Sequence, residues 1–289
     1  MVQIVDSLGE IADRYDAVFC DVWGCLHDGV TAFPEAVEGL RAFRAGGGKV
    51  VLLTNAPRSR AEVAKQFVDF NVPDDCWDTI ATSGDSARVA MFRGVVGDKV
   101  WYMGPSFDQP FFEVPKLVSD PTPIAQVALE EATGIVCLGP FDPHSDVDVN
   151  RPDFLYAKQK GLKLLCANPD IVVDRGETRE WCAGALAELY TEMGGESLYF
   201  GKPHPPVYTL ARQRLEEIGA HVPDSRILCV GDGIQTDIKG AMGEDLDSLF
   251  VTGGLARAET RTERQPEQGA LDTFAVSYTH LTLPTIYSV

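Results

Sequence analysis

The chain contains, at residues 17–29, the stretch AVFCDVWGCLHDG, which decides the fold. Its four apolar residues, 17–20, have the pattern of a short buried strand. The run ends at the carboxylate of Asp21, and Gly24 then permits a sharp turn that most residues resist. Reactive groups of open α/β sheets gather at the carboxyl ends of the strands. Asp21 is therefore a candidate functional residue, although such an aspartate, taken alone, more often only caps a turn.

Strands and helices alternate on both sides of the long middle region. Residues with helical periodicity lie at 34–45, 59–70, 206–218 and 237–242. Short apolar runs typical of buried strands lie at 50–53, 79–82, 226–230 and 248–251. This alternation predicts an α/β fold in which crossover helices connect the strands of a parallel sheet.

The middle of the chain has a different texture. Short apolar runs fall at 100–103, 135–138 and 162–166, among weaker helices and many prolines. We interpret it as a second α/β domain inserted into the first, whose pattern resumes at 198–200. The predicted core comprises residues 1–83 and 197–274, and the predicted insertion comprises residues 84–196.

The last residues do not fit the pattern. Residues 275–289 resemble the translation of a sequencing-library adapter read as coding sequence. We therefore predict that this tail is not native and leave it out of the fold prediction, as is appropriate for fusion scars. The native C-terminus would then be missing, and we expect the sheet to lack its last helix, with an edge strand a further candidate loss.

Composition and charge exclude several classes of partner. The net charge of −18 disfavours nucleic acid and anionic membranes, which require basic surfaces. No apolar stretch is long enough to span a bilayer, and the acidic N-terminus lacks the order of a signal peptide. Seven scattered cysteines without a secretion signal indicate reduced thiols. These features predict a cytoplasmic protein; the oligomeric state stays open, with a homodimer among the states that the sequence allows.

Polar residues follow three of the predicted core strands. Asp21 follows the first, Thr54 and Asn55 end the second, and Asp232 ends a later one. Because parallel strands bring their carboxyl ends to one edge of the sheet, we expect these side chains to meet. Oxygen ligands are those that Mg²⁺ prefers, so Asp21 and Asp232 are the predicted magnesium ligands.

Two further residues complete a phosphoryl-transfer site. Lys202 stands in a Gly-Lys-Pro turn before a helix, where its ammonium group can neutralise phosphate charge and hold a nucleophile in place. Asp237 follows Asp232 by five positions and can orient Lys202 or a metal-bound water. Asp21 is the predicted nucleophile, and Thr54 can donate its hydroxyl to a phosphate oxygen, with Asn55 beside it. Each residue alone is a weak signal, but the order of the set is specific.

The chain resembles the haloacid dehalogenase (HAD) superfamily of phosphohydrolases. The four motifs of that family match DVWG (21–24), LTN (53–55), GKP (201–203) and GDGIQTD (231–237). The insertion resembles the cap of subclass IIA, whose Thr-Asn-x-Asp element matches ANPD at 167–170. The resemblance implies a Rossmann-like core with an α/β cap, a Mg²⁺-dependent aspartyl-phosphate mechanism, and a metal ligand from the backbone carbonyl of Trp23.

One residue departs from the family pattern. Family phosphatases carry, two positions after the nucleophile, an aspartate that serves as general acid and base, but here that residue is Trp23. Indole cannot transfer the proton, and loss of a general acid typically costs about 10²- to 10⁴-fold in rate. His27 and Asp28 are candidate substitutes, although residues in such turns are more often only solvated.

The sequence thus predicts a HAD-like phosphatase acting on a small phosphorylated metabolite. The rival is a catalytically weakened protein that binds or senses such a metabolite with Mg²⁺, a hypothesis that Trp23 keeps open. Retention of the nucleophile Asp21 favours the enzyme. A dehalogenase ranks low because it would not need Thr54, Lys202 and Asp232.

Overall fold

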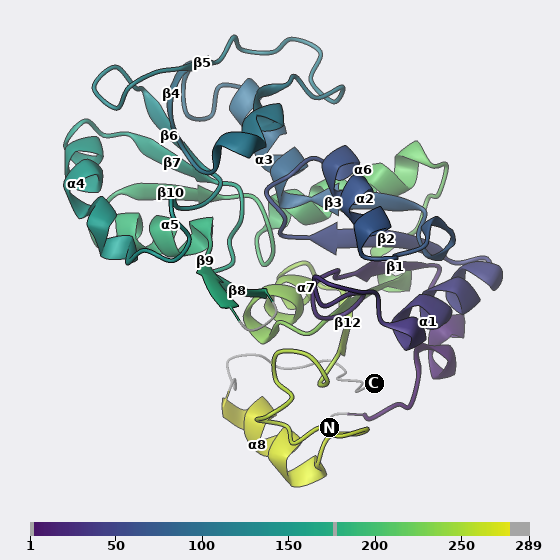
Figure 1. The fold of residues 1–289 in the computed structure, drawn as a ribbon. Helices are drawn as coiled ribbons and strands as arrows, with labels where there is room; N and C mark the ends of the chain where they lie inside the picture. Colours follow the sequence, from purple (N-terminus) through teal and green to yellow (C-terminus); the bar gives the residue numbers. More distant parts are fainter. Residues whose placement is uncertain (1–2, 176–177, 278–289) are drawn as a thin grey trace. The chain divides into compact units, whose positions relative to one another are not determined.

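The computed structural model describes residues 3–175 and 178–277 (Figure 1). Within this part the chain forms two compact units. Unit 1 comprises the described residues up to 54, residues 64–81 and those from 202 onwards; unit 2 comprises residues 55–63 and 82–201, apart from the undescribed pair. The chain is of the mixed α/β class, with a Rossmann-like core.

Unit 1 contains a five-stranded sheet with the strand order β12-β11-β1-β2-β3 (Figure 1). Its strands are β1 (Ala17–Cys20), β2 (Lys49–Thr54), β3 (Thr79–Thr82), β11 (Ile227–Gly231) and β12 (Asp247–Phe250). The pairs β1–β2, β1–β11 and β11–β12 are parallel. All four residues of the central strand β1 are buried, as expected for a parallel strand covered on both faces.

The register of this sheet aligns the carboxyl ends of three strands. Cys20, the last residue of β1, stands level with Leu52 in β2 and with Val230 in β11. The amide of Asp21 continues the ladder by donating to the carbonyl of Val230 at 2.8 Å. Asp21 and the residues that follow β2 and β11 are therefore brought to one edge of the sheet.

Among the described residues, five helices are associated with this sheet; the first four begin and end near predicted positions, and the last was not predicted. They are α1 (Pro34–Ala45), α2 (Arg60–Asp69, whose first turn belongs to unit 2), α6 (Pro205–Glu217), α7 (Lys239–Gly243) and α8 (Gln268–Ser277). Helices α1 and α6 start with proline, whose fixed φ suits the first helical turn. Both pack on β2. Shorter helical turns cover Leu8–Glu10, Ala12–Arg14, Asp74–Cys76, Asp224–Arg226 and Ile234–Ile238.

Unit 2 contains its own sheet, with the order β10-β7-β6-β4-β5. Its strands are β4 (Lys99–Met103), β5 (Ala125–Gln126), β6 (Gly134–Cys137), β7 (Lys163–Cys166) and β10 (Glu196–Tyr199), all paired in parallel. Its helices are α3 (Ser83–Phe92), α4 (Arg151–Gln159) and α5 (Ala183–Glu192), with short turns at Ser106–Phe112 and Val147–Asn150. Strands β8 (Val172–Arg175) and β9 (Thr178–Trp181) form a separate antiparallel hairpin.

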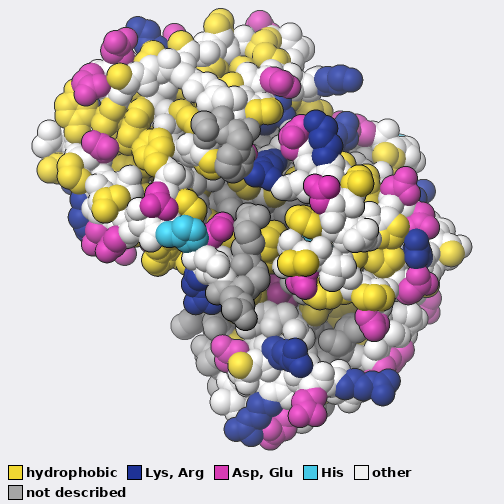
Figure 2. Space-filling view, viewed as in Figure 1, with side chains coloured by type: hydrophobic (Ala, Val, Ile, Leu, Met, Phe, Trp, Pro, Cys, Tyr) yellow, Lys and Arg dark blue, Asp and Glu magenta, His cyan; other side chains and the backbone are white. Residues whose placement is uncertain are grey.

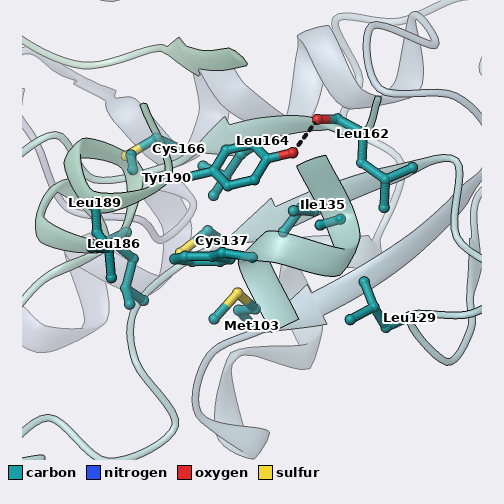
Figure 3. Close-up of a cluster of buried hydrophobic side chains, with 14 of the residues drawn as sticks. Met103, Leu129, Ile135, Cys137, Leu162, Leu164, Cys166, Leu186, Leu189 and Tyr190 are labelled. Atoms are coloured by element: carbon teal, nitrogen blue, oxygen red, sulfur yellow. Dashed lines mark hydrogen bonds between the residues drawn. The ribbon is translucent and has the colours of Figure 1, made fainter. Parts of the chain in front are cut away.

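One face of this second sheet carries a continuous apolar core (Figure 3). Side chains from β6 and β7, such as Ile135 and Leu164, pack there with Leu186 and Tyr190 of α5. The hydroxyl of Tyr190 donates to the carbonyl of Leu162 at 2.6 Å. This bond satisfies the one polar group of the buried tyrosine side chain.

The strand predicted around residues 198–200 lies in a different sheet from the one expected. It is β10, and its residues Glu196 to Tyr199 pair with β7 in unit 2 instead of resuming the first sheet. A short apolar run carries no information about which of two similar parallel sheets it joins, so the sequence pattern alone did not distinguish them. The functional division into a catalytic core and a cap remains a prediction.

A helix that the sequence did not predict lies at the C-terminal end of the described residues. Helix α8 continues through Ser277, beyond the predicted start of the tail at Ala275. Phe274 stacks on Phe250 of β12, with ring centroids 5.8 Å apart, and Ala275 packs on the same apolar cluster. Ala275, the first residue of the predicted tail, therefore packs on the domain in this structure, whereas the non-native origin of the tail stays a prediction. The rest of it, residues 278–289, lies outside the described residues.

The surface agrees with the charge of the sequence. On the face drawn in Figure 2, acidic side chains alternate with Lys and Arg, and the described residues form no continuous basic stretch there. Among residues 3–175 and 178–277, no helix has the length and apolar character needed to cross a bilayer.

The boundary can be tested with two truncated chains. Ending the chain after Ser277 is expected to leave the free energy of unfolding unchanged, because the removed residues are those of the adapter-like stretch. Ending it after Thr273 removes the Phe274–Phe250 stack and should cost about 1–2 kcal/mol. Urea denaturation of both chains measures the difference, and equal stability of the two would contradict the packing described here.

Candidate active site

A buried lysine shared by two aspartates forms the centre of the candidate site. The Nζ of Lys202 donates to Asp21 Oδ1 at 2.5 Å and to Asp237 Oδ1 at 2.7 Å. Only 2% of Lys202 is exposed. Lys202 precedes α6, Asp21 follows β1 and Asp237 follows β11, so three segments far apart in the sequence converge on one ammonium group.

The charges of this group are strongly coupled. Burial alone would lower the pKa of Lys202, but attraction to Asp21 and Asp237 outweighs it and raises that pKa well above its usual value, so the lysine stays protonated. Burial and the neighbouring Asp237 raise the pKa of Asp21, whereas Lys202 opposes that rise. The carboxylate therefore depends on the lysine for its ionised form.

A third carboxylate stands beside this group. Asp232 is buried, and its Oδ2 accepts the backbone N–H of Leu255 at 2.9 Å. Burial, followed by repulsion from Asp237, raises its pKa to about 7. The turn after β1 approaches it closely, because a Cβ at Gly24, whose φ is +84°, would collide with Asp232 Oδ2. Glycine is therefore required at that position both by its backbone and by its neighbour.

The donor set suits a divalent cation. Ligand atoms of Asp21, Cys25 and Asp232 all lie within 4.8 Å of one another, and all three residues are buried. Around them, the three carboxylates of Asp21, Asp232 and Asp237 face the single ammonium of Lys202 within the site as described. A divalent cation would offset this excess of negative charge, and two of the donors are the carboxylate oxygens that Mg²⁺ prefers.

Asp237 is held in place by the backbone that follows β11. It lies in a π-helical turn, Ile234–Ile238, where the sequence predicted the start of an ordinary helix. The N–H of Gly233 donates to Asp237 Oδ2 at 3.0 Å, which leaves Oδ1 for Lys202. Such π turns are often found at functional sites because they redirect a side chain without ending the helix.

The two polar residues predicted at the end of β2 are arranged differently from each other. Thr54 is the last residue of β2, next to β1, and is 7% exposed. Asn55 belongs to unit 2, where its Nδ2 donates to Asp170 Oδ1 at 2.8 Å. The amide of Asp170 is in turn fixed by Asn168 Oδ1 at 3.0 Å. The sequence named the 167–170 element but not this contact, which links the residue after Thr54 to a loop of the insertion.

Trp23 takes part in the turn itself. Its backbone forms a bridge with His27, and the N–H of Gly24 donates to the His27 carbonyl at 2.9 Å. The indole ring lies over Gly29, where a Cβ would collide with it, and it contacts the His27 ring edge-on with the ring centroids 5.3 Å apart. The departure from the family pattern is thus accommodated by aromatic packing within residues 23–29.

The two candidate substitute acids have structural roles in this turn. His27 is buried against Phe67 and Phe70, and its Nδ1 accepts the N–H of Gly29 at 3.0 Å. Burial lowers its pKa to about 4, so the ring is neutral near pH 7. Asp28 is exposed, and the backbone N–H groups of Thr31 and Val30 that it accepts lower its pKa. Neither environment favours a proton donor, which supports the interpretation of both as turn residues.

Comparisons with known proteins agree with this geometry. Residues 18–112 match the family described as haloacid dehalogenase-like hydrolase, and residues 199–276 match a HAD-hydrolase-like family. A haloacid dehalogenase-like hydrolase of Brucella suis 1330 is 34% identical, covers 98% of both chains and superposes with a TM-score of 0.83. The chain therefore belongs to the haloacid dehalogenase-like hydrolases.

Two phosphatases resemble the chain more distantly. The ribonucleotide monophosphatase NagD of Escherichia coli K12 is 26% identical over 243 residues, which are 83% of this chain and 88% of NagD. That relationship places the chain in subclass IIA. A glycerol phosphate phosphatase of Mycobacterium tuberculosis, solved with magnesium, shares the fold at 23% identity and a TM-score of 0.64, covering 88% of this chain and 73% of that one.

Because His27 is buried in its neutral form, it should make the free energy of unfolding depend on pH. Its folded pKa of about 4 lies below the ordinary value of 6.5, so the unfolded chain binds more protons between these values and stability falls as the pH falls. Between pH 7.5 and 5.5 this group should cost about 1 kcal/mol. His27→Gln should flatten that part of the stability–pH curve relative to wild type in urea titrations.

The control is His221→Gln, which changes an exposed histidine. It should leave the slope of the curve as in wild type. An unchanged slope in His27→Gln would show that His27 is not held neutral by burial.

Proposed function

We propose that the protein is a Mg²⁺-dependent phosphatase that hydrolyses a small phosphorylated metabolite through an aspartyl-phosphate on Asp21. The observation that carries this proposal is the buried ammonium of Lys202 held between Asp21 and Asp237. As a member of its family, the chain is a hydrolase, and its relatives are named as phosphatases acting on phosphoester bonds. Its seven free cysteines suit the reducing cytoplasm, where we place it.

The proposed reaction proceeds in two steps. In the first, a carboxylate oxygen of Asp21 attacks phosphorus, and the ester oxygen leaves with its bonding electron pair. In the second, water attacks phosphorus of the acyl phosphate, which releases inorganic phosphate and restores the carboxylate. Lys202 orients Asp21 and balances charge on the phosphoryl oxygens, and the hydroxyl of Thr54 donates to one of them.

The family's metal fits beside these residues. Asp21, Asp232 and the backbone carbonyl of Trp23 would hold Mg²⁺, which when bound neutralises charge on the phosphoryl group. Asp237 keeps Lys202 in place and has no proposed contact with substrate. Asn55, engaged by Asp170, fixes the backbone immediately after Thr54.

The nucleophile can be tested directly. Purified protein with Mg²⁺ should release phosphate from members of a panel of phosphorylated metabolites, and Asp21→Asn should abolish that release because an amide cannot form the acyl phosphate. Far-ultraviolet circular dichroism should show both proteins folded. Asp69→Asn, an exposed change on α2, is the matched control and should keep full activity. An active Asp21→Asn, or tight binding of a phosphorylated ligand without turnover by wild type, would contradict the proposal.

The tryptophan at position 23 leads to a second prediction, which concerns how the rate depends on the leaving group. Without an acid at this position the leaving oxygen departs as an anion, so aryl phosphates should turn over much faster than alkyl phosphates. Trp23→Asp should raise kcat for alkyl esters by up to about 10²- to 10⁴-fold and change aryl esters little. Measuring kcat and KM separately distinguishes this effect on the chemical step from any change in substrate binding.

The matched control for this test is Trp23→Phe, which keeps an aromatic ring but supplies no acid. It should not accelerate alkyl esters. If wild type already hydrolyses alkyl and aryl esters at similar rates, another acid is present and the role assigned to position 23 is wrong.

A further inference from the structure

Cys25 lies where the family scheme assigns no ligand. It follows Gly24 in the turn after β1, and 7% of the residue is exposed. Its sulfur lies within 4.8 Å of carboxylate oxygens of both Asp21 and Asp232, and those oxygens lie within the same distance of each other. One ion bonded to all three atoms requires such mutual proximity, because metal–sulfur and metal–oxygen bonds are about 2.3 and 2.1 Å long.

The sulfur of Cys25 has no hydrogen-bond partner among the residues that the structure describes. Some other buried thiols of the chain do have acceptors: the Sγ of Cys20 donates to the carbonyl of Asp21 at 3.1 Å, and that of Cys76 to the carbonyl of Pro73 at 3.1 Å. Cys25 is thus a buried polar group directed at two carboxylates without a local structural partner to explain it.

A sulfur donor changes which ions the site accepts. Mg²⁺ binds oxygen ligands and gains little from a thiol, whereas Zn²⁺ and Co²⁺ bind thiolate together with carboxylate. We propose that Cys25, Asp21 and Asp232 form a mixed sulfur–oxygen site that binds thiophilic divalent cations in place of Mg²⁺. When the sulfur bonds to the cation, its proton passes to solvent.

This inference rests on the metal site of the proposed function and extends it to a competing ion. Both classes of ion need Asp21 and Asp232, so they cannot occupy the site together. A thiophilic ion that also holds Cys25 would engage the nucleophile Asp21 and exclude Mg²⁺. Low concentrations of Zn²⁺ should therefore inhibit the enzyme by competition with Mg²⁺, and the inhibition should depend on the sulfur.

Cobalt titration tests the sulfur ligand without an activity assay. Metal-free protein titrated with Co²⁺ should develop visible d–d bands, which report binding, and a near-ultraviolet sulfur-to-cobalt charge-transfer band, which reports the thiolate. Cys25→Ser should lose the charge-transfer band and weaken Co²⁺ binding by roughly tenfold or more. The affinity for Mg²⁺ should change much less, so the ratio of the two affinities is the decisive quantity.

Two further variants make the outcome unambiguous. Cys182→Ser, which changes a buried thiol at the start of α5, should keep the charge-transfer band. Cys25→Val, with a side chain of similar size, should lose the band and should remain folded by circular dichroism if the serine variant does not. The visible bands and the sulfur band then report separate claims.

The results separate this inference from the proposed function. Visible bands without a charge-transfer band, or a band that survives in both Cys25 variants, would overturn the role of Cys25 while leaving the metal site intact. If neither Co²⁺ nor Mg²⁺ binds the wild-type protein, the metal site of the proposed function fails, and the mixed site fails with it.

Discussion

The sharing of one buried ammonium group by two carboxylates is the interaction on which the site depends. Lys202 contacts Asp21 and Asp237 while almost wholly removed from solvent. Charges in such a place are stable only when they are paired, and removing one partner typically costs about 3–5 kcal/mol. The sheet register, the turn before α6 and the π-helical turn after β11 therefore have to place three side chains accurately for the site to exist at all.

The same cluster explains why the site is suited to phosphoryl transfer. With Asp232 beside it, the group holds more carboxylates than cations, and the pKa of Asp232 rises to about 7 through burial and repulsion from Asp237. A bound divalent cation would relieve that excess, and a phosphoryl group would then meet positive charge on both the cation and Lys202. The close approach of Gly24 to Asp232 brings the turn after Asp21, the proposed nucleophile, against Asp232, a proposed metal ligand.

The features of the fold and site that follow from local sequence pattern could be predicted from the sequence. The end of each parallel strand is visible in the order of residues, so Asp21, Thr54 and Asp232 could be assigned to one edge of the sheet from the sequence alone. Features that depend on tertiary partners could not be predicted. These are the pairing of β10 in the second sheet, the Asn55–Asp170 contact, the position of the Cys25 sulfur and the helix α8 that runs through Ser277. Each is decided by what a side chain or strand meets across the fold, which neither periodicity nor spacing records.

The central claim is that Asp21 receives the phosphoryl group. A crystal structure of the protein with Mg²⁺ and beryllium fluoride, which mimics a phosphoryl group on a carboxylate, tests it most directly. The account predicts beryllium bonded to an oxygen of Asp21, with fluorine atoms in contact with Lys202 and Thr54 and with the cation held by Asp21 and Asp232. Beryllium fluoride bound elsewhere while Asp21 stays bare in a metal-loaded site would contradict it.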